Sequence, residues 1–292
     1  MTTSLGPDFA RRLERLAIRV RRAFAGRLQG ERRSTKRGVS IEFADFREYV
    51  AGDDPRHLDW NAAARMDRLY LKLFVEEEDL SVHFLVDVSA SMDCGTPSKL
   101  DCARQITAAL AYVSLASLDR VTVRPFAAGV GDALGPERGK AAIWKLLRFL
   151  DGLKPGGAGT LTASVREFVA QGARRGPVFV VSDLLEPSGW EGAIALLRSA
   201  GYQPMVIHVL SPEELSPPDA DDVRFVDAES GAEVEVSLTR SVARAYAARV
   251  EAFRSGAASW CRRRDVPYAF TRSDADLEEF VIRGLRTLFL QS

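Results

Sequence analysis

Residues 84–91 read Phe-Leu-Val-Asp-Val-Ser-Ala-Ser, an apolar run followed by one carboxylate and two hydroxyls. Such a run is typical of a strand buried in a parallel sheet, and open α/β sheets bind ligands just beyond the carboxyl ends of their strands. Asp87, Ser89 and Ser91 are expected in the turn that follows the strand. Because hard divalent cations take oxygen ligands, the stretch predicts an ion site of the form D-x-S-x-S at the edge of a sheet.

Two later segments offer more oxygen atoms to the same ion. Residues 156–160 form a glycine-rich loop ending in Thr160, and residues 178–183 form a second apolar run ending in Asp183. Thr160 would add a third hydroxyl, with Thr162 as the alternative, and Asp183 would bind through water or orient the waters around the ion. In the competing interpretation, the two serines only cap the next helix and the second carboxylate lies in a turn.

The candidate ligands are Asp87, Ser89, Ser91, Thr160 and Asp183. This set resembles the metal-ion-dependent adhesion site of von Willebrand factor A domains, which implies bound Mg²⁺, or Mn²⁺ or Ca²⁺ in its place. Three neutral hydroxyls and one direct carboxylate leave part of the cation's charge uncompensated, so an acidic side chain of a partner protein is expected to complete its coordination. The sequence departs from that family after Thr160, where Leu161 and Thr162 replace an acidic or small residue and a leucine.

Strands and helices alternate after residue 80, as they do in a parallel sheet with helices on both faces. Strands are expected over residues 82–87, 120–126, 178–182, 203–210 and 267–270. Helices are expected over residues 98–118, 139–150, 161–174, 189–200, 239–264 and 276–290. A β-hairpin over residues 225–236 and a loop over residues 211–222 complete this part. The predicted fold class is therefore α/β, with a von Willebrand A-like (Rossmann-like), mostly parallel sheet over residues 80–292.

The first 79 residues are predicted to form a basic helix and an irregular arm packed on the main domain. Residues 8–28 have the pattern of a helix capped by Asp8, and residues 38–78 scatter aromatic side chains among charges. Residues 1–40 hold eleven Lys or Arg against three acidic residues. Nucleic-acid binding is not expected, because apolar rather than aromatic residues lie between the arginines. A helix docked on an acidic face of its own domain or of a partner is the simpler interpretation.

The arm carries a more specific pattern. Residues 42–49, 52–60, 64–65 and 69–72 resemble the signature of the bacterial family called domain of unknown function 58. That resemblance implies an arm followed by a von Willebrand A-like domain with the ion motif, and a MoxR-type AAA+ ATPase as partner. Eight charged residues lie close together in the arm: Asp45, Arg47, Glu48, Asp53, Asp54, Arg56, Asp59 and Arg65. They are expected to pair with one another, with a partner surface as the alternative, and His57 is expected to be structural.

Several enzyme classes lack their motifs. Residues 135–140 miss a spacer and the Ser or Thr of a P-loop, and neither G-x-S-x-G nor H-E-x-x-H occurs. A Mg²⁺-dependent phosphatase-like hydrolase using Asp87 is the enzymatic alternative, but such enzymes need a second Asp where Ser89 stands. We expect instead a non-enzymatic, metal-dependent binding module that acts as an adaptor. A purely structural interaction protein without a functional ion is the other alternative.

Composition sets the expected compartment. The 292 residues include three cysteines without C-x-x-C spacing, so neither a zinc site nor a disulfide framework is indicated. No stretch has the pattern of a signal peptide, and no apolar run approaches the roughly 18 residues of a membrane span. A cytoplasmic protein is expected. The sequence leaves the oligomeric state open, because apolar residues of the arm could belong to a dimer interface.

Overall fold

The computed structural model describes the following residues: 7–24, 43–50, 58–60, 68–74, 80–127, 129–130, 132–157, 160–186, 188–216, 222–226, 231–237 and 239–290. The chain divides into two compact units. The first contains Met1–Val20 and Leu80–Ser292, and the second contains Arg21–Asp79.

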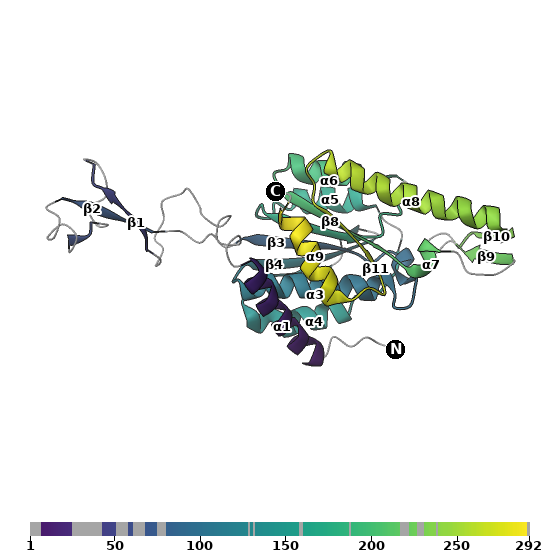
Figure 1. Ribbon diagram of the computed structural model, residues 1–292, viewed down its shortest axis with the longest axis horizontal. Helices are drawn as coiled ribbons and strands as arrows, with labels where there is room; N and C mark the ends of the chain where they lie inside the picture. Colours follow the sequence, from purple (N-terminus) through teal and green to yellow (C-terminus); the bar gives the residue numbers. More distant parts are fainter. Residues whose placement is uncertain are drawn as a thin grey trace. The chain divides into compact units, whose positions relative to one another are not determined.

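A mixed sheet of seven strands forms the centre of the first unit (Figure 1). Five strands run parallel in the order β11 (Tyr268–Arg272), β8 (Gln203–Leu210), β7 (Pro177–Ser182), β3 (Ser81–Asp87) and β4 (Arg120–Ala127). Two short strands, β5 (Gly129–Val130) and β6 (Leu134–Arg138), pair antiparallel with β4. Every residue of β3 and β7 is buried, as expected for strands covered on both faces. The predicted α/β class with a mostly parallel sheet is confirmed.

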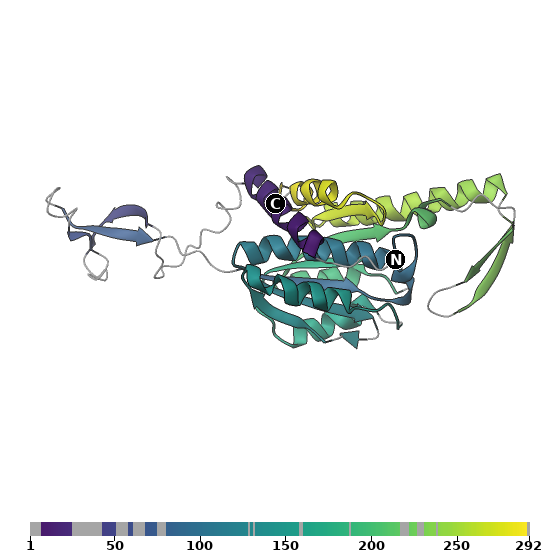
Figure 2. The ribbon, with the colours of Figure 1, turned by 90° about the horizontal axis from the view of Figure 1, so that it is seen from below.

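Helices cover both faces of this sheet (Figures 1 and 2). On one face, α5 (Leu161–Ala170), α6 (Glu191–Ser199) and α8 (Arg240–Arg262) share an apolar core with strand residues such as Leu85 and Val180. On the other face, α3 (Lys99–Ala116) packs against α4 (Ile143–Asp151) and α9 (Leu277–Leu290). These six helices match the six predicted helical segments, although α4 begins four residues later than expected. A 3₁₀ turn, η3 (Lys140–Ala142), and strand β6 precede it.

Helix α1 (Pro7–Phe24) belongs, as far as Val20, to the same unit as the sheet. Its apolar residues Leu13 and Leu16 are buried, and Arg12 forms an ion pair with Glu278 of α9 at 3.8 Å. Figure 2 shows α1 beside α9. The predicted helix over residues 8–28 is thus confirmed to Phe24, and residues 25–28 lie outside the described part. No helix in the described part of the chain is long and apolar enough to cross a membrane.

The second unit contains an antiparallel pair of strands, β1 (Phe43–Glu48) and β2 (Tyr70–Phe74). Leu58 bridges to Leu71, and the N–H of Asp59 donates to the carbonyl of Tyr70 at 2.9 Å. The arm that was predicted as irregular therefore contains a pair of strands that the sequence did not indicate. The two strands are more than twenty residues apart, so no turn signal marks them as a hairpin in the sequence.

Part of the arm's charged signature is described and part is not. Asp59 is buried, and Glu48 pairs with Arg68 at 2.9 Å. The predicted charged residues Asp53, Asp54, Arg56 and Arg65, as well as His57, lie outside the described residues, as do the side chains of Asp45 and Arg47.

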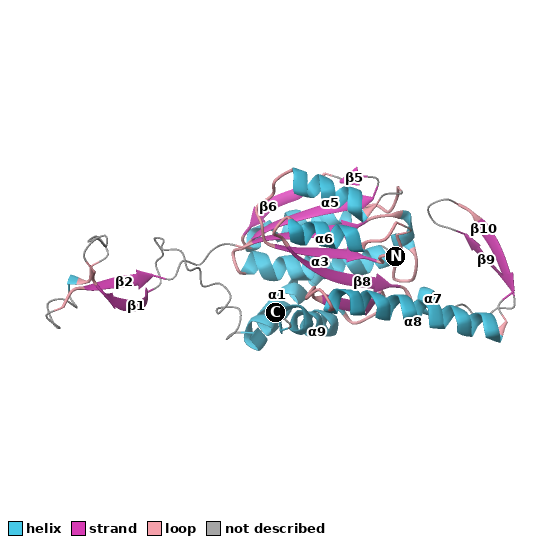
Figure 3. Ribbon diagram, turned by 90° about the horizontal axis from the view of Figure 1, so that it is seen from above, coloured by secondary structure: helices cyan, strands magenta, loops and turns pink. Residues whose placement is uncertain are grey.

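A two-stranded hairpin precedes α8. Strand β9 (Asp222–Val226) pairs antiparallel with β10 (Glu233–Ser237), which confirms the predicted hairpin. Figures 1 and 3 show it beyond the N-terminal end of α8, away from the sheet. The segment before it was predicted as a loop over residues 211–222, but it begins with a short helix, α7 (Pro212–Leu215). Residues 217–221 of that predicted loop lie outside the described part.

Candidate ion site at the carboxyl edge of the sheet

Strand register brings the two predicted carboxylates to one level of the sheet. Asp87 ends β3, and Asp183 directly follows β7, which is the parallel neighbour of β3. Val86 lies opposite Val181, so Asp87 and Ser182 are the next residues on the two strands. After Asp87 the chain turns into the 3₁₀ turn η2 (Ala90–Asp93) and then into α3.

Four of the five predicted ligands are joined by hydrogen bonds. The N–H of Ser89 donates to Asp87 Oδ1 at 2.9 Å, and the Oγ atoms of Ser89 and Ser91 lie 3.0 Å apart. The hydroxyl of Ser91 then donates to Asp183 Oδ2 at 2.8 Å. Ser182, which the sequence analysis did not single out, donates its hydroxyl to Asp87 Oδ2 at 2.5 Å. Both carboxylates are therefore fixed in orientation by their neighbours.

The capping interpretation of the two serines is wrong. Ser98, not Ser89 or Ser91, is the N-cap of α3, and its Oγ accepts from the N–H of Asp101. Ser89 precedes η2 without a side-chain capping bond. The hydroxyls of the D-x-S-x-S segment are thus directed at each other and at Asp183 rather than at a helix end.

Thr160 lies at the N-terminus of α5, where its Oγ1 accepts from the N–H of Ala163 at 3.1 Å. Its loop is close to the serines, because the N–H of Gly156 donates to the carbonyl of Val88 at 2.8 Å. Within the described residues, the hydrogen bonds do not link Thr160 to the other four candidates. The alternative, Thr162, faces α6, since its Oγ1 is 4.0 Å from the position that a Cβ on Gly192 would take.

Two charged residues that the sequence analysis missed reach the same network. The side chain of Lys99 is fully buried, and its Nζ lies 2.6 Å from Asp183 Oδ2 and also pairs with Glu214 Oε1. Glu214 is held by a capping box at the start of α7, in which the N–H of Ser211 donates to its Oε2 at 2.8 Å. The Ser-x-x-Glu spacing of that box is visible in the sequence and could have indicated this short helix.

The electrostatic environments of the two aspartates differ. Burial raises the pKa of Asp87 to about 6, and the charge of Asp183 acts in the same direction. Burial would also raise the pKa of Asp183, but the Lys99 ammonium and the hydrogen bonds from Lys99, Leu185 and Ser91 hold it below its usual range. Burial opposes the charge of Lys99, yet the two carboxylates raise its pKa above the ordinary value. The negative charge of Asp183 is thus balanced by the Lys99 ammonium. The ionised form of Asp87 is instead destabilised by burial and by the charge of Asp183.

The donor set is compatible with a hard cation. The side-chain donor atoms of the five candidate ligands are all oxygens. The 3.0 Å between the two serine Oγ atoms equals the edge of an octahedron with metal–oxygen bonds of about 2.1 Å. In the described part of the chain, no group of three or more His, Cys, Asp or Glu side chains could hold a metal. A site here would therefore depend on hydroxyl ligands.

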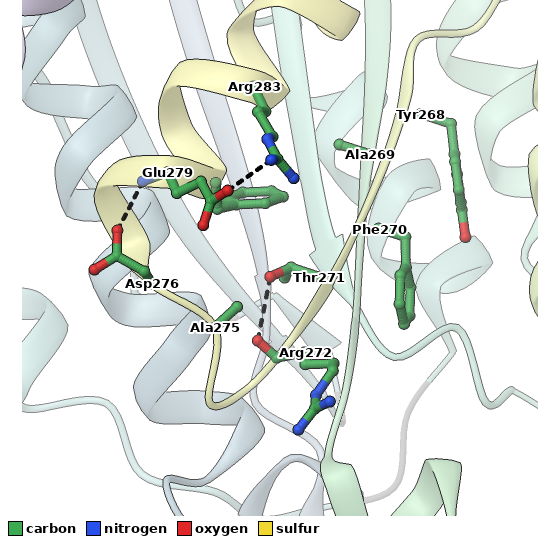
Figure 4. A pocket seen from close by; sticks show the side chains of 10 residues that line it. Tyr268, Ala269, Phe270, Thr271, Arg272, Ala275, Asp276, Glu279 and Arg283 are labelled. Carbon is green, nitrogen blue, oxygen red and sulfur yellow. Dashed lines mark hydrogen bonds and ion pairs between the residues drawn. The ribbon is translucent and has the colours of Figure 1, made fainter.

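A groove elsewhere on the first unit does not include these residues. It has a volume of about 360 Å³ and lies between β11 and α9, lined by residues that include Phe270, Thr271 and Arg272. Figure 4 shows the Glu279–Arg283 ion pair along one side. The groove belongs to the edge strand, two strands away from β7.

The three cysteines have different environments. Cys94 is exposed directly after η2, and its Sγ lies 3.6 Å from Ser211 Oγ. Cys102 and Cys261 are buried, and burial raises the pKa of each thiol to about 12. All three are free thiols.

Comparisons with known proteins agree with the arm signature. Residues 45–256 match the family described as "Protein of unknown function DUF58". An uncharacterized protein of Mycobacterium tuberculosis is 28% identical over 283 residues, which span 95% of this chain and 89% of that protein. Among solved structures, BatB from Bacteroides thetaiotaomicron is 16% identical with a TM-score of 0.44, over 72% of this chain and 98% of BatB. A von Willebrand factor type A protein from Catenulispora acidiphila is 11% identical with a TM-score of 0.42, over 73% and 44% of the two chains.

Proposed function

The chain belongs to the DUF58 family of proteins of unknown function, and on that basis we propose that it is a non-enzymatic, metal-dependent protein-binding module. Asp87, Ser89, Ser91 and Thr160 would hold Mg²⁺, or Mn²⁺ or Ca²⁺ in its place. Asp183 would act on the ion through water and through Ser91. When bound, the ion would supply an electrophilic centre for an acidic side chain of a partner protein.

The observation that supports this proposal most strongly is the chain of hydrogen bonds from Asp87 to Asp183. Because Ser91 donates its proton to Asp183 at 2.8 Å, it can only accept in its hydrogen bond with Ser89, and one lone pair of its oxygen remains for a cation. Ser89 Oγ lies 3.0 Å from Ser91 Oγ, so two neutral oxygens lie next to each other. Their spacing is compatible with neighbouring ligands of one octahedral ion.

Charge supports the same proposal. Lys99 compensates Asp183 and Glu214, and the pKa of Asp87 is raised by burial and by the charge of Asp183. A divalent cation beside Asp87 would stabilise the ionised carboxylate. The ion would then retain positive charge that one carboxylate does not cancel, and a partner's Asp or Glu would be attracted to it.

The positions of the serines favour binding over hydrolysis. A phosphatase of the kind considered above would need a second carboxylic acid at position 89 to transfer a proton. Ser89 instead uses its N–H to hold Asp87 and its hydroxyl to contact Ser91. A neutral hydroxyl is a poor general acid at neutral pH.

We further propose a MoxR-type AAA+ ATPase as the partner, with this chain as its adaptor. The family resemblance of the arm supports this choice, and the absence of complete nucleotide-binding motifs from the sequence is consistent with a partner that supplies ATP hydrolysis.

Capture of the ATPase by the purified protein tests the function. We expect capture with Mg²⁺, loss of capture with EDTA, and loss in the Asp87→Ala variant, because that variant lacks the direct carboxylate. Asp93→Asn is the matched control, since Asp93 is an exposed carboxylate in η2, and it should behave as wild type. Calorimetric titration of each variant with Mn²⁺ alone would show whether binding of the ion is lost together with capture. Equal capture with Mg²⁺ and with EDTA would contradict an ion-bridged interface.

A further inference from the structure

Lys99 is an unusual residue for its position. It is the first residue of α3, where the positive end of the helix dipole disfavours a cation. Its side chain is nevertheless fully buried, and a buried ammonium is stable only when it is paired. Its two partners are Asp183 and Glu214, one of which belongs to the proposed ion site. The charge of Lys99 is therefore part of the electrostatics of that site.

The contacts of Asp183 show what the ammonium does there. Asp183 Oδ2 accepts from Ser91 Oγ at 2.8 Å and from Lys99 Nζ at 2.6 Å, so both of its lone pairs are used. Asp183 Oδ1 accepts from the N–H of Leu185 at 3.0 Å. The oxygen that faces the serines is thus occupied by an ammonium. A cation could bind this oxygen directly only if Lys99 moved away.

Glu214 weakens the effect of the Lys99 charge on Asp183. It comes from α7 and shares the Lys99 ammonium with Asp183. Its position is fixed by the capping box with Ser211 and by Tyr246 of α8, whose hydroxyl donates to the Glu214 carbonyl at 2.9 Å. The positive charge at Asp183 is therefore partly offset by a carboxylate from a separate element.

We propose that Lys99 is an internal counter-cation that sets the ligand set and the ion affinity of the site. It keeps Asp183 Oδ2 from binding the ion directly, and its charge repels the ion. Both effects hold the affinity low, so that a partner carboxylate contributes a large share of the binding energy. The inference rests on the proposed function, because it concerns the same ion.

Ion binding by Lys99 variants tests the inference. Lys99→Met keeps the length of the side chain without its charge, and it frees Asp183 Oδ2. We expect its affinity for Mn²⁺, measured by calorimetry without a partner, to rise by about tenfold or more. Its ion-free melting temperature should fall, because the buried Asp183 and the partly buried Glu214 lose their cation, and saturating Mn²⁺ should recover most of that loss. Lys99→Arg should restore the wild-type affinity.

Two further variants separate this role from a structural one. Lys145→Met removes an exposed lysine paired with Glu137 in another part of the unit, and it should leave the ion affinity unchanged. Glu214→Gln leaves the full charge of Lys99 on Asp183, so the affinity for Mn²⁺ should fall several-fold. This variant keeps Lys99 paired with Asp183. Its expected change in Mn²⁺ affinity is opposite to that of Lys99→Met, so it tests the role of Lys99 even where Lys99→Met folds poorly.

The outcomes distinguish the two proposals. One outcome is that wild type, Lys99→Met and Glu214→Gln all bind Mn²⁺ with the same affinity. That result would overturn the role of Lys99 and leave the ion site intact. A melting temperature that falls equally with and without Mn²⁺ in Lys99→Met would also overturn it. Absence of Mn²⁺ binding in every variant, wild type included, would instead reject the proposed ion site itself.

Discussion

At the scale of single residues, the site contains carboxylates with opposite electrostatic preferences. Asp183 is stabilised as an anion by Lys99, whereas burial and the charge of Asp183 raise the pKa of Asp87 to about 6. In the unfolded chain an aspartate has a pKa of about 3.9. The folded, ion-free protein therefore binds a proton at Asp87 more tightly than the unfolded chain does. Its stability should decrease as the pH rises from about 4 to about 6.

Asp87→Asn should remove this loss. The variant keeps an acceptor for the N–H of Ser89 but has no charge to bury, so the ion-free variant should be more stable than wild type at pH 7.5. A shift of two pKa units corresponds to roughly 3 kcal/mol, and the advantage should shrink toward pH 4. Urea unfolding in EDTA at several pH values measures it. Asp93→Asn, in which the lost carboxylate is exposed, should show no such dependence, and an advantage that is constant with pH would contradict the assignment.

Sequence reasoning found part of this residue-scale arrangement. Asp87, Ser89, Ser91 and Asp183 were identified because they follow apolar runs, and strand pairing brings such ends together. Lys99 and Glu214 were not identified, since Lys99 is 84 positions from Asp183 and 115 positions from Glu214 in the sequence. A lysine in the first turn of a helix ordinarily faces solvent, and only the tertiary fold shows that this one is buried.

At the scale of elements, the site depends on the register between β3 and β7. That register places Val86 opposite Val181, and so brings Asp87 level with Ser182. Gly176, directly before β7, allows β7 to start close to β3, because a Cβ there would lie 2.2 Å from the carbonyl oxygen of Ser81. A side chain at this position would push the start of β7 away from β3.

Gly176→Ala should therefore destabilise the protein by about 1–3 kcal/mol, the usual effect of an overpacked interior position. Gly256→Ala is the matched control, because Gly256 lies in the exposed face of α8 with no atom within 4 Å of the new Cβ. That control should stabilise by about 0.5–1 kcal/mol, as expected for alanine in a helix interior. Chemical unfolding of both variants measures the two changes in the free energy of unfolding. Changes of the same sign would show that the Ser81 carbonyl does not restrict position 176.

The helices and strands differed in how well the sequence predicted them. Strands β3, β7 and β8 were predicted because buried strands form long apolar runs. Strands β5 and β6 were missed, since they are short and contain Gly and Pro, and α7 was missed because it has only four residues. Strands β1 and β2 were missed because their pairing partner is distant along the chain. Short elements depend on tertiary contacts more than on local pattern.

At the scale of the molecule, the first unit is discontinuous in sequence. Met1–Val20 belongs with Leu80–Ser292, and residues of the second unit lie between them along the chain. Helix α1 contributes buried apolar residues, including Leu16 at 2% exposure. The basic helix is thus a structural part of the sheet domain as well as a carrier of positive charge.

Leu16→Ala should destabilise the first unit by about 2–5 kcal/mol, as other large-to-small core substitutions do. Ile18→Ala on the same helix is the control, since Ile18 is 52% exposed, and it should change stability by less than about 1 kcal/mol. Thermal unfolding followed by near-ultraviolet circular dichroism reports on the core of the unit. Similar small effects of both variants would show that α1 does not contribute to its stability.

The unequal exposure of the three thiols makes the protein easy to observe. Only Cys94 is exposed, while Cys102 and Cys261 are buried with raised thiol pKa values, so a maleimide dye should attach at one position without any engineered cysteine. Cys94 lies three residues beyond Ser91 and beside Ser211 at the start of α7. A fluorophore there would lie close to the proposed ion site, so its emission would test binding of a cation or of a partner.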